Sequence, residues 1–100
     1  MYRGTTPTLT FQLPIDTGSI TVLSIAVAQA GQVKIEKTLP DVHLDGNVVS
    51  CTLTEAETLS LTAGRGIDAK IQLQVGVGAQ RMASQVFEVP VERILRDGAL

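Results

Sequence analysis

The stretch Ile71-Gln72-Leu73-Gln74-Val75-Gly76-Val77 decides the fold. Apolar residues occupy every second position, and glutamine or glycine fills the places between them. Side chains of an extended strand point alternately to opposite faces, so this period of two predicts a strand with one buried face and one solvated face. Such a strand needs a second apolar layer against its buried face, and the rest of the chain supplies further strands for it.

Other strands are predicted on both sides of this stretch. Residues 9–13 alternate apolar with polar side chains, residues 22–27 are apolar on nearly both faces, and residues 32–36 alternate again. A segment that is apolar on both faces is typical of a central strand. The last strand is predicted through residues 85–91. Pro90 lacks an amide donor, so this strand is expected at a sheet edge or at a bulge.

A hairpin and a short helix are predicted between these strands. Residues 42–44 and 48–53 flank Asp45-Gly46-Asn47, and the Asp-Gly pair accepts the positive φ angles of a type I′ turn. Thr54-Glu55-Ala56-Glu57 matches a capping box, in which a threonine hydroxyl and a glutamate three residues later satisfy each other's amides. The sequence therefore predicts one helical turn near residues 55–59, crossing between strands.

The strand count and spacing define the expected fold class. The chain has 100 residues, which fits one domain spanning 1–100. About seven strands at spacings of roughly 8–12 residues predict an all-β, antiparallel, immunoglobulin-like sandwich. No Cys–Trp–Cys spacing is present, so a true antibody-type domain is not expected. A small, partly open barrel is the alternative architecture.

Composition excludes several classes of function. Lys+Arg total 8 against Asp+Glu 10, the net charge is -2, and the basic residues are spread along the chain. Binding to nucleic acid needs several basic residues on one face, so no nucleic-acid partner is expected. No run of about 18 apolar residues occurs, so no membrane span is expected. Sugar recognition loses support because the chain has no Trp and one Tyr.

Few residues could carry chemistry. Cys51 lies in an apolar stretch and is interpreted as a small buried hydrophobe. Asp41, His43 and Asp45 alternate on one face and could hold a metal, but Asp45 belongs to the turn and Asp41 follows a proline, which favours a solvated hairpin face. His43 is the single histidine, and no nucleophile-elbow motif accompanies it. No catalytic, cofactor-binding or metal-binding residue is predicted, and an enzyme is not expected.

The opening of the chain, Met1-Tyr2-Arg3-Gly4-Thr5-Thr6-Pro7-Thr8-Leu9-Thr10-Phe11-Gln12-Leu13-Pro14, carries a family resemblance. It resembles small prophage proteins of Gram-positive gut bacteria whose chains begin with an Arg-Gly-Thr-Thr-Pro-Thr stretch. The resemblance continues through residues 44–47, 53–59, 71–75 and 83–84. A looser similarity links the layout to the N-terminal sandwich domain of phage baseplate upper proteins. The resemblance implies a structural component of the tail or baseplate region, made in the bacterial host cytoplasm and residing in the virion.

The expected function is non-enzymatic assembly through protein–protein contacts, with other phage structural proteins or as a homo-oligomer. The lead-in before the first strand is polar and extended. We interpret it either as a simple lead-in or as an arm that adds a strand to a neighbouring copy or partner. The alternative functions are a small binding module for a host-surface glycan or peptide, and a small metal-dependent or hydrolytic enzyme built around His43. The predicted partner-contact residues are Arg3, Thr5, Thr6, Pro7, Arg93, Ile94 and Leu95.

Overall fold

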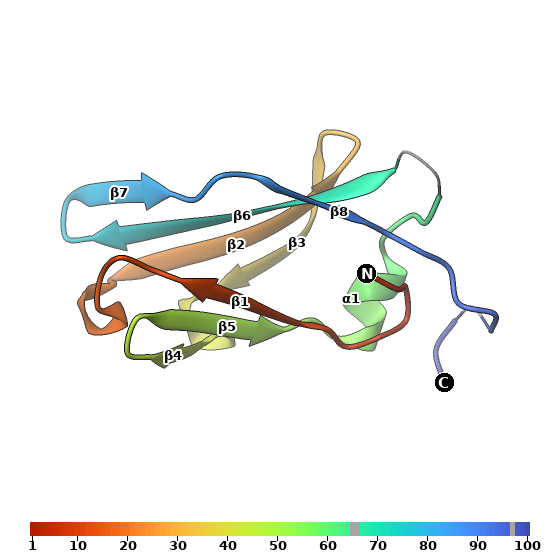
Figure 1. The fold of residues 1–100 in the computed structure, drawn as a ribbon, viewed down its shortest axis with the longest axis horizontal. Coiled ribbons are helices and arrows are strands. Elements are labelled where there is room, and N and C mark those ends of the chain that lie inside the picture. Colours follow the sequence, from red (N-terminus) through yellow and green to blue (C-terminus); the bar gives the residue numbers. More distant parts are fainter. Residues whose placement is uncertain (65–66, 97) are drawn as a thin grey trace.

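Two antiparallel sheets packed face to face make up the structure, a computed structural model that describes residues 1–64, 67–96 and 98–100 (Figure 1). One sheet has the order β1-β5-β4, and the other has the order β3-β2-β6-β7, with β8 also pairing with β6. The predicted β-sandwich is confirmed, and the barrel alternative is wrong because the strands form two separate sheets. The elements are β1 (Thr8–Gln12), η1 (Thr17–Ser19), β2 (Val22–Gln29), β3 (Gln32–Thr38), η2 (Leu39–Asp41), β4 (His43–Asp45), β5 (Val48–Thr52), α1 (Glu55–Leu59), β6 (Asp68–Val77), β7 (Gln80–Ala83) and β8 (Phe87–Pro90).

The strand order matches that of an immunoglobulin sandwich without its first strand. Strands β1, β5 and β4 take the places of B, E and D, and β3, β2 and β6 take those of C′, C and F. Strands β7 and β8 together take the place of G. No strand among the described residues lies beside β1, where strand A pairs in that fold. Instead, Tyr2 near the N-terminus forms a parallel bridge with Glu92, just beyond β8.

The core fills the space between the two sheets. Alternate side chains of β2 and β6 point inward, as the period of two predicts, and they meet the inward side chains of β5. Cys51 is among the buried residues, which confirms its interpretation as a small hydrophobe. The centre of the core consists of Leu23, Ile25, Val27, Val49, Cys51, Leu53, Ile71, Leu73 and Val75.

The hairpin between β4 and β5 differs from the predicted turn. Asp45 pairs with Val48, so the loop consists of Gly46 and Asn47 rather than of the Asp-Gly pair. Only Gly46 has a positive φ, of 61°, whereas a type I′ turn needs two such residues. The prediction of a type I′ turn is therefore wrong, and the pattern is that of type II′. The reason is tertiary, because Asn47 exchanges hydrogen bonds with Leu13 through its carbonyl and its side-chain amide.

The predicted last strand, residues 85–91, is shorter in the structure, and an additional strand precedes it. That strand is β7 at residues 80–83, and β8 begins only at Phe87. Between them, the Ser84 hydroxyl accepts a hydrogen bond from the Leu73 amide at 3.0 Å, and the Ser84 amide donates to the Leu73 carbonyl at 2.8 Å. The side chain thus replaces a backbone acceptor and interrupts the ladder. Pro90 lies in an edge strand, as predicted.

Candidate functional site

Strand β1 lies at the edge of the three-stranded sheet, and its backbone is paired on one side only. The Leu13 amide donates to Asn47, and the Pro7 carbonyl accepts from Leu53, so odd-numbered residues turn their backbone groups toward β5. Along a strand, the amide and carbonyl groups of successive residues point alternately to its two sides. The amides and carbonyls of Thr8, Thr10 and Gln12 therefore point away from β5, and no strand of the described residues pairs with them.

An apolar groove runs beside this free edge. Its near wall is the inward face of β1, and its far wall comes from β6, β8 and the end of β7. One part has a volume of about 430 Å³, and the adjoining part, toward Ile15 and Met82, has about 440 Å³. No ionisable side chain lines either part. The residues that line the groove include Leu9, Phe11, Leu13, Ile71, Leu73, Phe87 and Val89.

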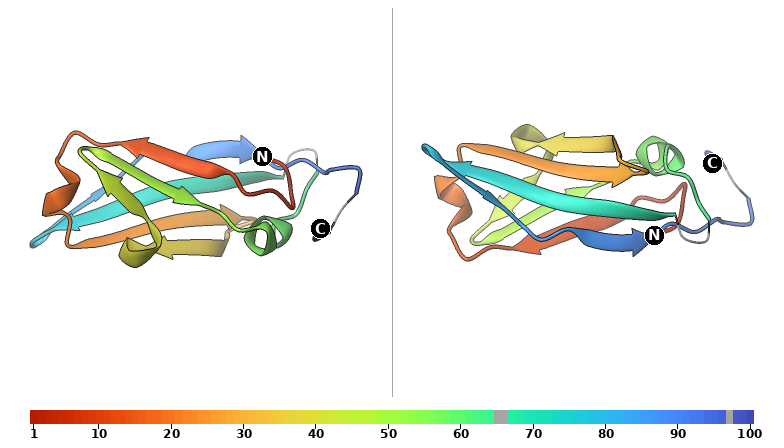
Figure 2. Two further views of the ribbon diagram at one scale, coloured as in Figure 1. Left: turned by 90° about the horizontal axis from the view of Figure 1, so that it is seen from below. Right: turned by 90° about the horizontal axis from the view of Figure 1, so that it is seen from above.

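The two strands that border the groove cross each other. Phe11 of β1 and Phe87 of β8 meet across it with ring centroids 6.2 Å apart and an interplanar angle of 56°. Figure 2 shows that β8 lies outside β1 near the start of β1, whereas β1 is the outer strand near its own end. Phe87 remains 40% exposed although it belongs to a ring pair. The groove is thus open to solvent at Phe87.

The other strand edges of the described residues are protected. Edge strand β3 carries charges at Lys34 and Glu36, β4 has only three residues, and β7 carries Arg81. Strand β8 ends in Pro90, and the chain beyond it is covered by residues 1–3. Charges, prolines and short length are the usual means by which proteins keep edges from pairing. Strand β1 has five residues and none of these protections.

The predicted N-terminal arm is bound to its own domain. Arg3 donates to the carbonyls of Leu61 at 2.6 Å and Leu59 at 2.8 Å, around the end of α1. The Thr5 carbonyl accepts from the buried Thr58 hydroxyl at 2.8 Å, and the Pro7 carbonyl is held by β5 through Leu53. In the described structure the lead-in is therefore part of the fold. Thr6 is exposed, and partner contact by these residues stays a prediction.

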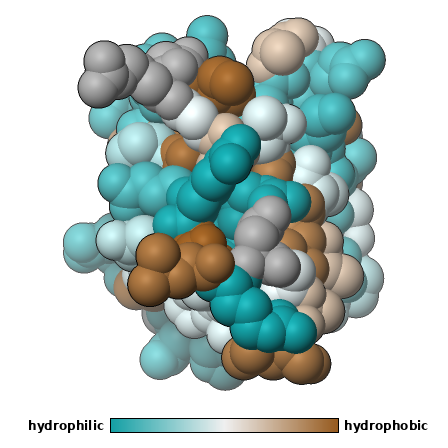
Figure 3. Space-filling model, turned by 90° about the vertical axis from the view of Figure 1, so that its right-hand side faces the viewer, coloured by the Kyte–Doolittle hydropathy of each residue, from teal (hydrophilic) through white to brown (hydrophobic). Residues whose placement is uncertain are grey.

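The segment with the predicted C-terminal contact residues follows β8 at the end of the molecule where the N-terminus also lies (Figure 1). The Ile94 side chain is partly buried and lies close to Gly4, whereas Arg93 and Leu95 are exposed. Ile94 therefore packs against the domain, whereas Leu95 does not. In Figure 3, hydrophobic residues on this end form separate areas interrupted by hydrophilic ones. The apolar groove lies instead along β1.

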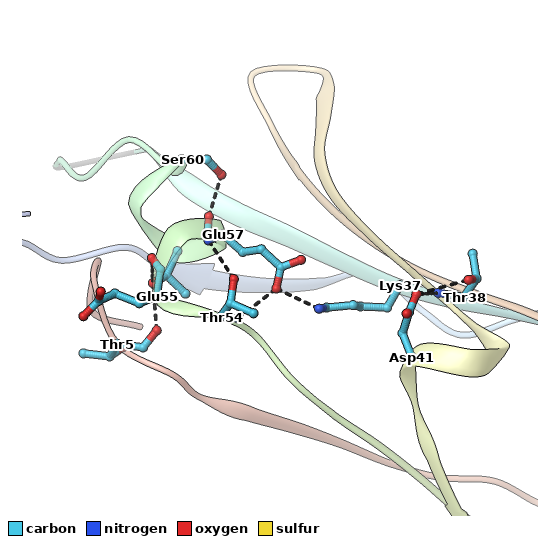
Figure 4. A network of polar contacts seen from close by, with 9 residues as sticks. Thr5, Lys37, Thr38, Asp41, Thr54, Glu55, Glu57 and Ser60 are labelled. Carbon is cyan, nitrogen blue, oxygen red and sulfur yellow. Dashed lines mark hydrogen bonds and ion pairs between the residues drawn. The ribbon is translucent and has the colours of Figure 1, made fainter. Parts of the chain in front are cut away.

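A polar network joins α1, which follows β5 of one sheet, to β3 of the other sheet (Figure 4). The predicted capping box is confirmed, with the Thr54 hydroxyl accepting from the Glu57 amide at 3.1 Å and Glu57 Oε1 accepting from the Thr54 amide at 2.8 Å. The same carboxylate forms an ion pair with Lys37 of β3 at 2.7 Å. Burial by itself raises the pKa of Glu57, but the bonds from Lys37 and Thr54 together hold that pKa below its ordinary value.

Stability is expected to fall as acid protonates this network. Because the pKa of Glu57 is lower in the folded protein, its stabilising contribution is complete above the ordinary value of 4.5 and is lost as the pH falls below it. Lys37→Met should reduce the free energy of unfolding at pH 7 by about 1 kcal/mol and flatten the pH dependence below 4.5. Urea titrations between pH 7 and 3 measure this. Lys34→Met, on the same strand but exposed, is the control and should retain the wild-type pH slope.

The residues considered for metal binding do not form a cluster. Asp41 lies in η2, where its carboxylate accepts from the amide of Thr38 at 3.0 Å and from its hydroxyl at 3.1 Å. These bonds lower the pKa of Asp41. His43 and Asp45 are exposed on β4. No group of three or more His, Cys, Asp or Glu side chains that could hold a metal occurs within residues 1–64, 67–96 and 98–100.

Cys51 is not placed for nucleophilic chemistry. Its side chain is buried beneath η2, and burial raises the pKa of the thiol. A protonated, enclosed thiol is a poor nucleophile.

Comparison with known proteins finds no match to this chain. The chain matches no protein-family model, no curated protein and no solved structure. Within the part of the chain that the structure describes, no helix is both long and apolar enough to cross a membrane.

Proposed function

We propose that the protein is a non-enzymatic structural component of a phage or prophage tail or baseplate and that it acts through protein–protein contacts at β1. The observation that supports an assembly role is the free backbone edge of β1 beside an uncharged apolar groove. Addition of a strand to such an edge gives affinity through main-chain hydrogen bonds and specificity through pockets for alternate side chains. The phage context comes from the resemblance of the N-terminal stretch, and the partners are then other structural proteins of the virion.

A peptide-binding module is the second candidate, because the same groove fits an extended peptide. Its walls offer apolar side chains at the spacing of a strand, and the edge offers the backbone groups of Thr8, Thr10 and Gln12. A glycan receives less support from this surface. Sugar sites need many directed polar groups beside their aromatic platforms, whereas the groove is lined mainly by aliphatic and phenylalanine side chains.

The composition of purified virus particles tests the proposal. Particles from the phage or induced prophage that encodes the chain should contain it in a fixed ratio to the tail proteins, retained through high-salt washing. Mass spectrometry with labelled reference peptides measures that ratio. A virion free of the chain, with the chain left in the soluble lysate fraction, would overturn the structural role.

Incorporation should depend on the β1 edge. Thr10→Lys places a charge beside the free backbone groups of β1, and we expect the variant to be depleted from particles. Gln74→Lys is the matched control, because Gln74 is also an exposed polar residue, but it lies on the central strand β6 of the other sheet and outside the groove. Equal incorporation of both variants would show that β1 is not the contact.

A further inference from the structure

We infer that the groove is occupied by β1 of a second copy of this chain, paired antiparallel about a twofold axis at Thr10. The inference rests on the proposed role of β1 in assembly and names the partner. A symmetric dimer presents the same patch from both subunits, so that patch must be complementary to itself. The edge of β1 meets this requirement in its hydrogen bonds, its side chains, its charge and its shape.

The hydrogen-bonding groups of β1 are self-complementary. A twofold axis at Thr10 sets Thr10 opposite its own copy and Thr8 opposite Gln12 of the second copy. All three residues turn their amides and carbonyls toward the free edge. Each facing pair can therefore exchange two hydrogen bonds, as in any antiparallel ladder. The result joins the two three-stranded sheets into one continuous sheet.

The side chains also find matching partners in this register. On the groove face, Leu9 comes opposite Phe11 of the second copy, and Phe11 opposite Leu9. These are pairs without direct backbone hydrogen bonds, whose side chains approach most closely. On the outer face, the Thr10 side chains of the two copies come side by side. Paired threonines of this kind can form a hydrogen bond across two strands. The exposed side of the Phe11–Phe87 ring pair would become covered.

Charge favours a second copy over other segments of this chain. A charged side chain on the twofold axis would face an identical one, and a charge elsewhere on the edge would need an opposite charge at the position that it faces. Strand β1 and the groove carry none. The exposed C-terminal segment of a neighbour is a poor occupant, because Arg93 and Arg96 would have to enter an uncharged apolar groove.

The shape of the side wall is complementary to itself as well. Strand β8 projects beyond β1 near the start of β1, and the second sheet recedes behind β1 near its end (Figure 2). The twofold axis brings the projecting β8 of each copy over the recessed end of the other. That recess is the part of the groove lined by Leu13, Ile15 and Met82.

Light scattering behind size exclusion, over a wide range of concentration, tests the inference. We expect a mass that rises with concentration to twice 10.6 kDa and no further, since twofold pairing closes. Thr10→Pro removes the outward amide while leaving the bonds to β5, and it should raise the dimer dissociation constant roughly a hundredfold. Thr10→Lys should do the same without a change in the backbone, and Gln74→Lys, on the central strand β6 of the other sheet, should leave the dimer intact. Circular dichroism checks that all three variants fold.

The following results overturn the inference and leave the proposed function to its own test. A monomer at every concentration, or a dimer that persists in both Thr10 variants, excludes β1 pairing between copies. If a capped peptide of residues 8–13 leaves the Thr10 amide of the chain unprotected from hydrogen exchange, the edge does not accept a copy of β1. A dimer together with particles that lack the chain would uphold the pairing and overturn the phage role, so the two failures are distinguishable.

Discussion

Ile25→Ala is expected to lower the free energy of unfolding by about 3 to 4 kcal/mol. Ile25 is 0% exposed and lies in the middle of β2, where it pairs with Lys37 of β3 and Leu73 of β6. The substitution removes buried methyl and methylene groups from the most enclosed layer of the core, and the two flanking strands prevent collapse of the cavity. Since a domain of this size is stable by only about 5–15 kcal/mol, the loss should be visible as a large shift of the urea midpoint.

Val33→Ala is the matched control for this substitution. Val33 is also a β-branched aliphatic residue in the same sheet, but it is 60% exposed on β3. Its truncation should change the free energy of unfolding by less than about 0.5 kcal/mol. Similar losses for the two variants would mean that the inward face of β2 is not the core face.

The core was predictable from the sequence because its signal is local. Alternation along residues 71–77 and the doubly apolar run at 22–27 reflect the two faces of one strand each, so no knowledge of the neighbours is needed. The capping box at Thr54 and Glu57 is equally local, and α1 begins where it predicts. These elements fix the class of fold, and the structure confirms it.

The errors arose where tertiary contacts override local preference. The Asp-Gly signal predicts a turn in isolation, but hydrogen bonds between Asn47 and Leu13 set the loop one residue later. The break at Ser84 depends on a hydroxyl that accepts from Leu73 of the neighbouring strand, which no period along residues 80–91 can show. A sequence pattern predicts which face of a strand is buried, but it does not predict which strand lies next to it.

The candidate site was missed for the same reason. Strands β1, β2 and β5 all lack charged residues, but only β1 lies at an edge. In a central strand the absence of charge reflects burial, whereas at an edge it leaves a surface that can pair. The sequence predicted partner contacts nearby, at Arg3 to Pro7. In the structure those residues are bound to α1 and β5, and the segment that follows them, β1, has the free edge instead.

Gln29→Met is expected to cost about 2 to 4 kcal/mol in the free energy of unfolding, which denaturant titration measures. Gln29 is 3% exposed at the end of β2. Its amide nitrogen donates to the Thr62 carbonyl at 2.8 Å, and its oxygen accepts from the Thr62 amide at 2.7 Å. Methionine has a similar length but offers neither bond, so both backbone groups of Thr62 lose their partner. These bonds tie the segment after α1 to the sheet.

Gln29→Glu separates the hydrogen bonds from mere packing. A carboxylate still accepts from the Thr62 amide, but it meets the Thr62 carbonyl without a proton to donate, whereas the neutral acid restores both bonds. Burial and this carbonyl both favour the neutral acid, so they raise the pKa of the introduced carboxyl in the folded state. The variant should therefore gain stability relative to wild type as the pH falls from 7 toward 5, a window that lies above the ordinary pKa of Glu57. Parallel pH profiles for variant and wild type would mean that Gln29 acts by filling space alone.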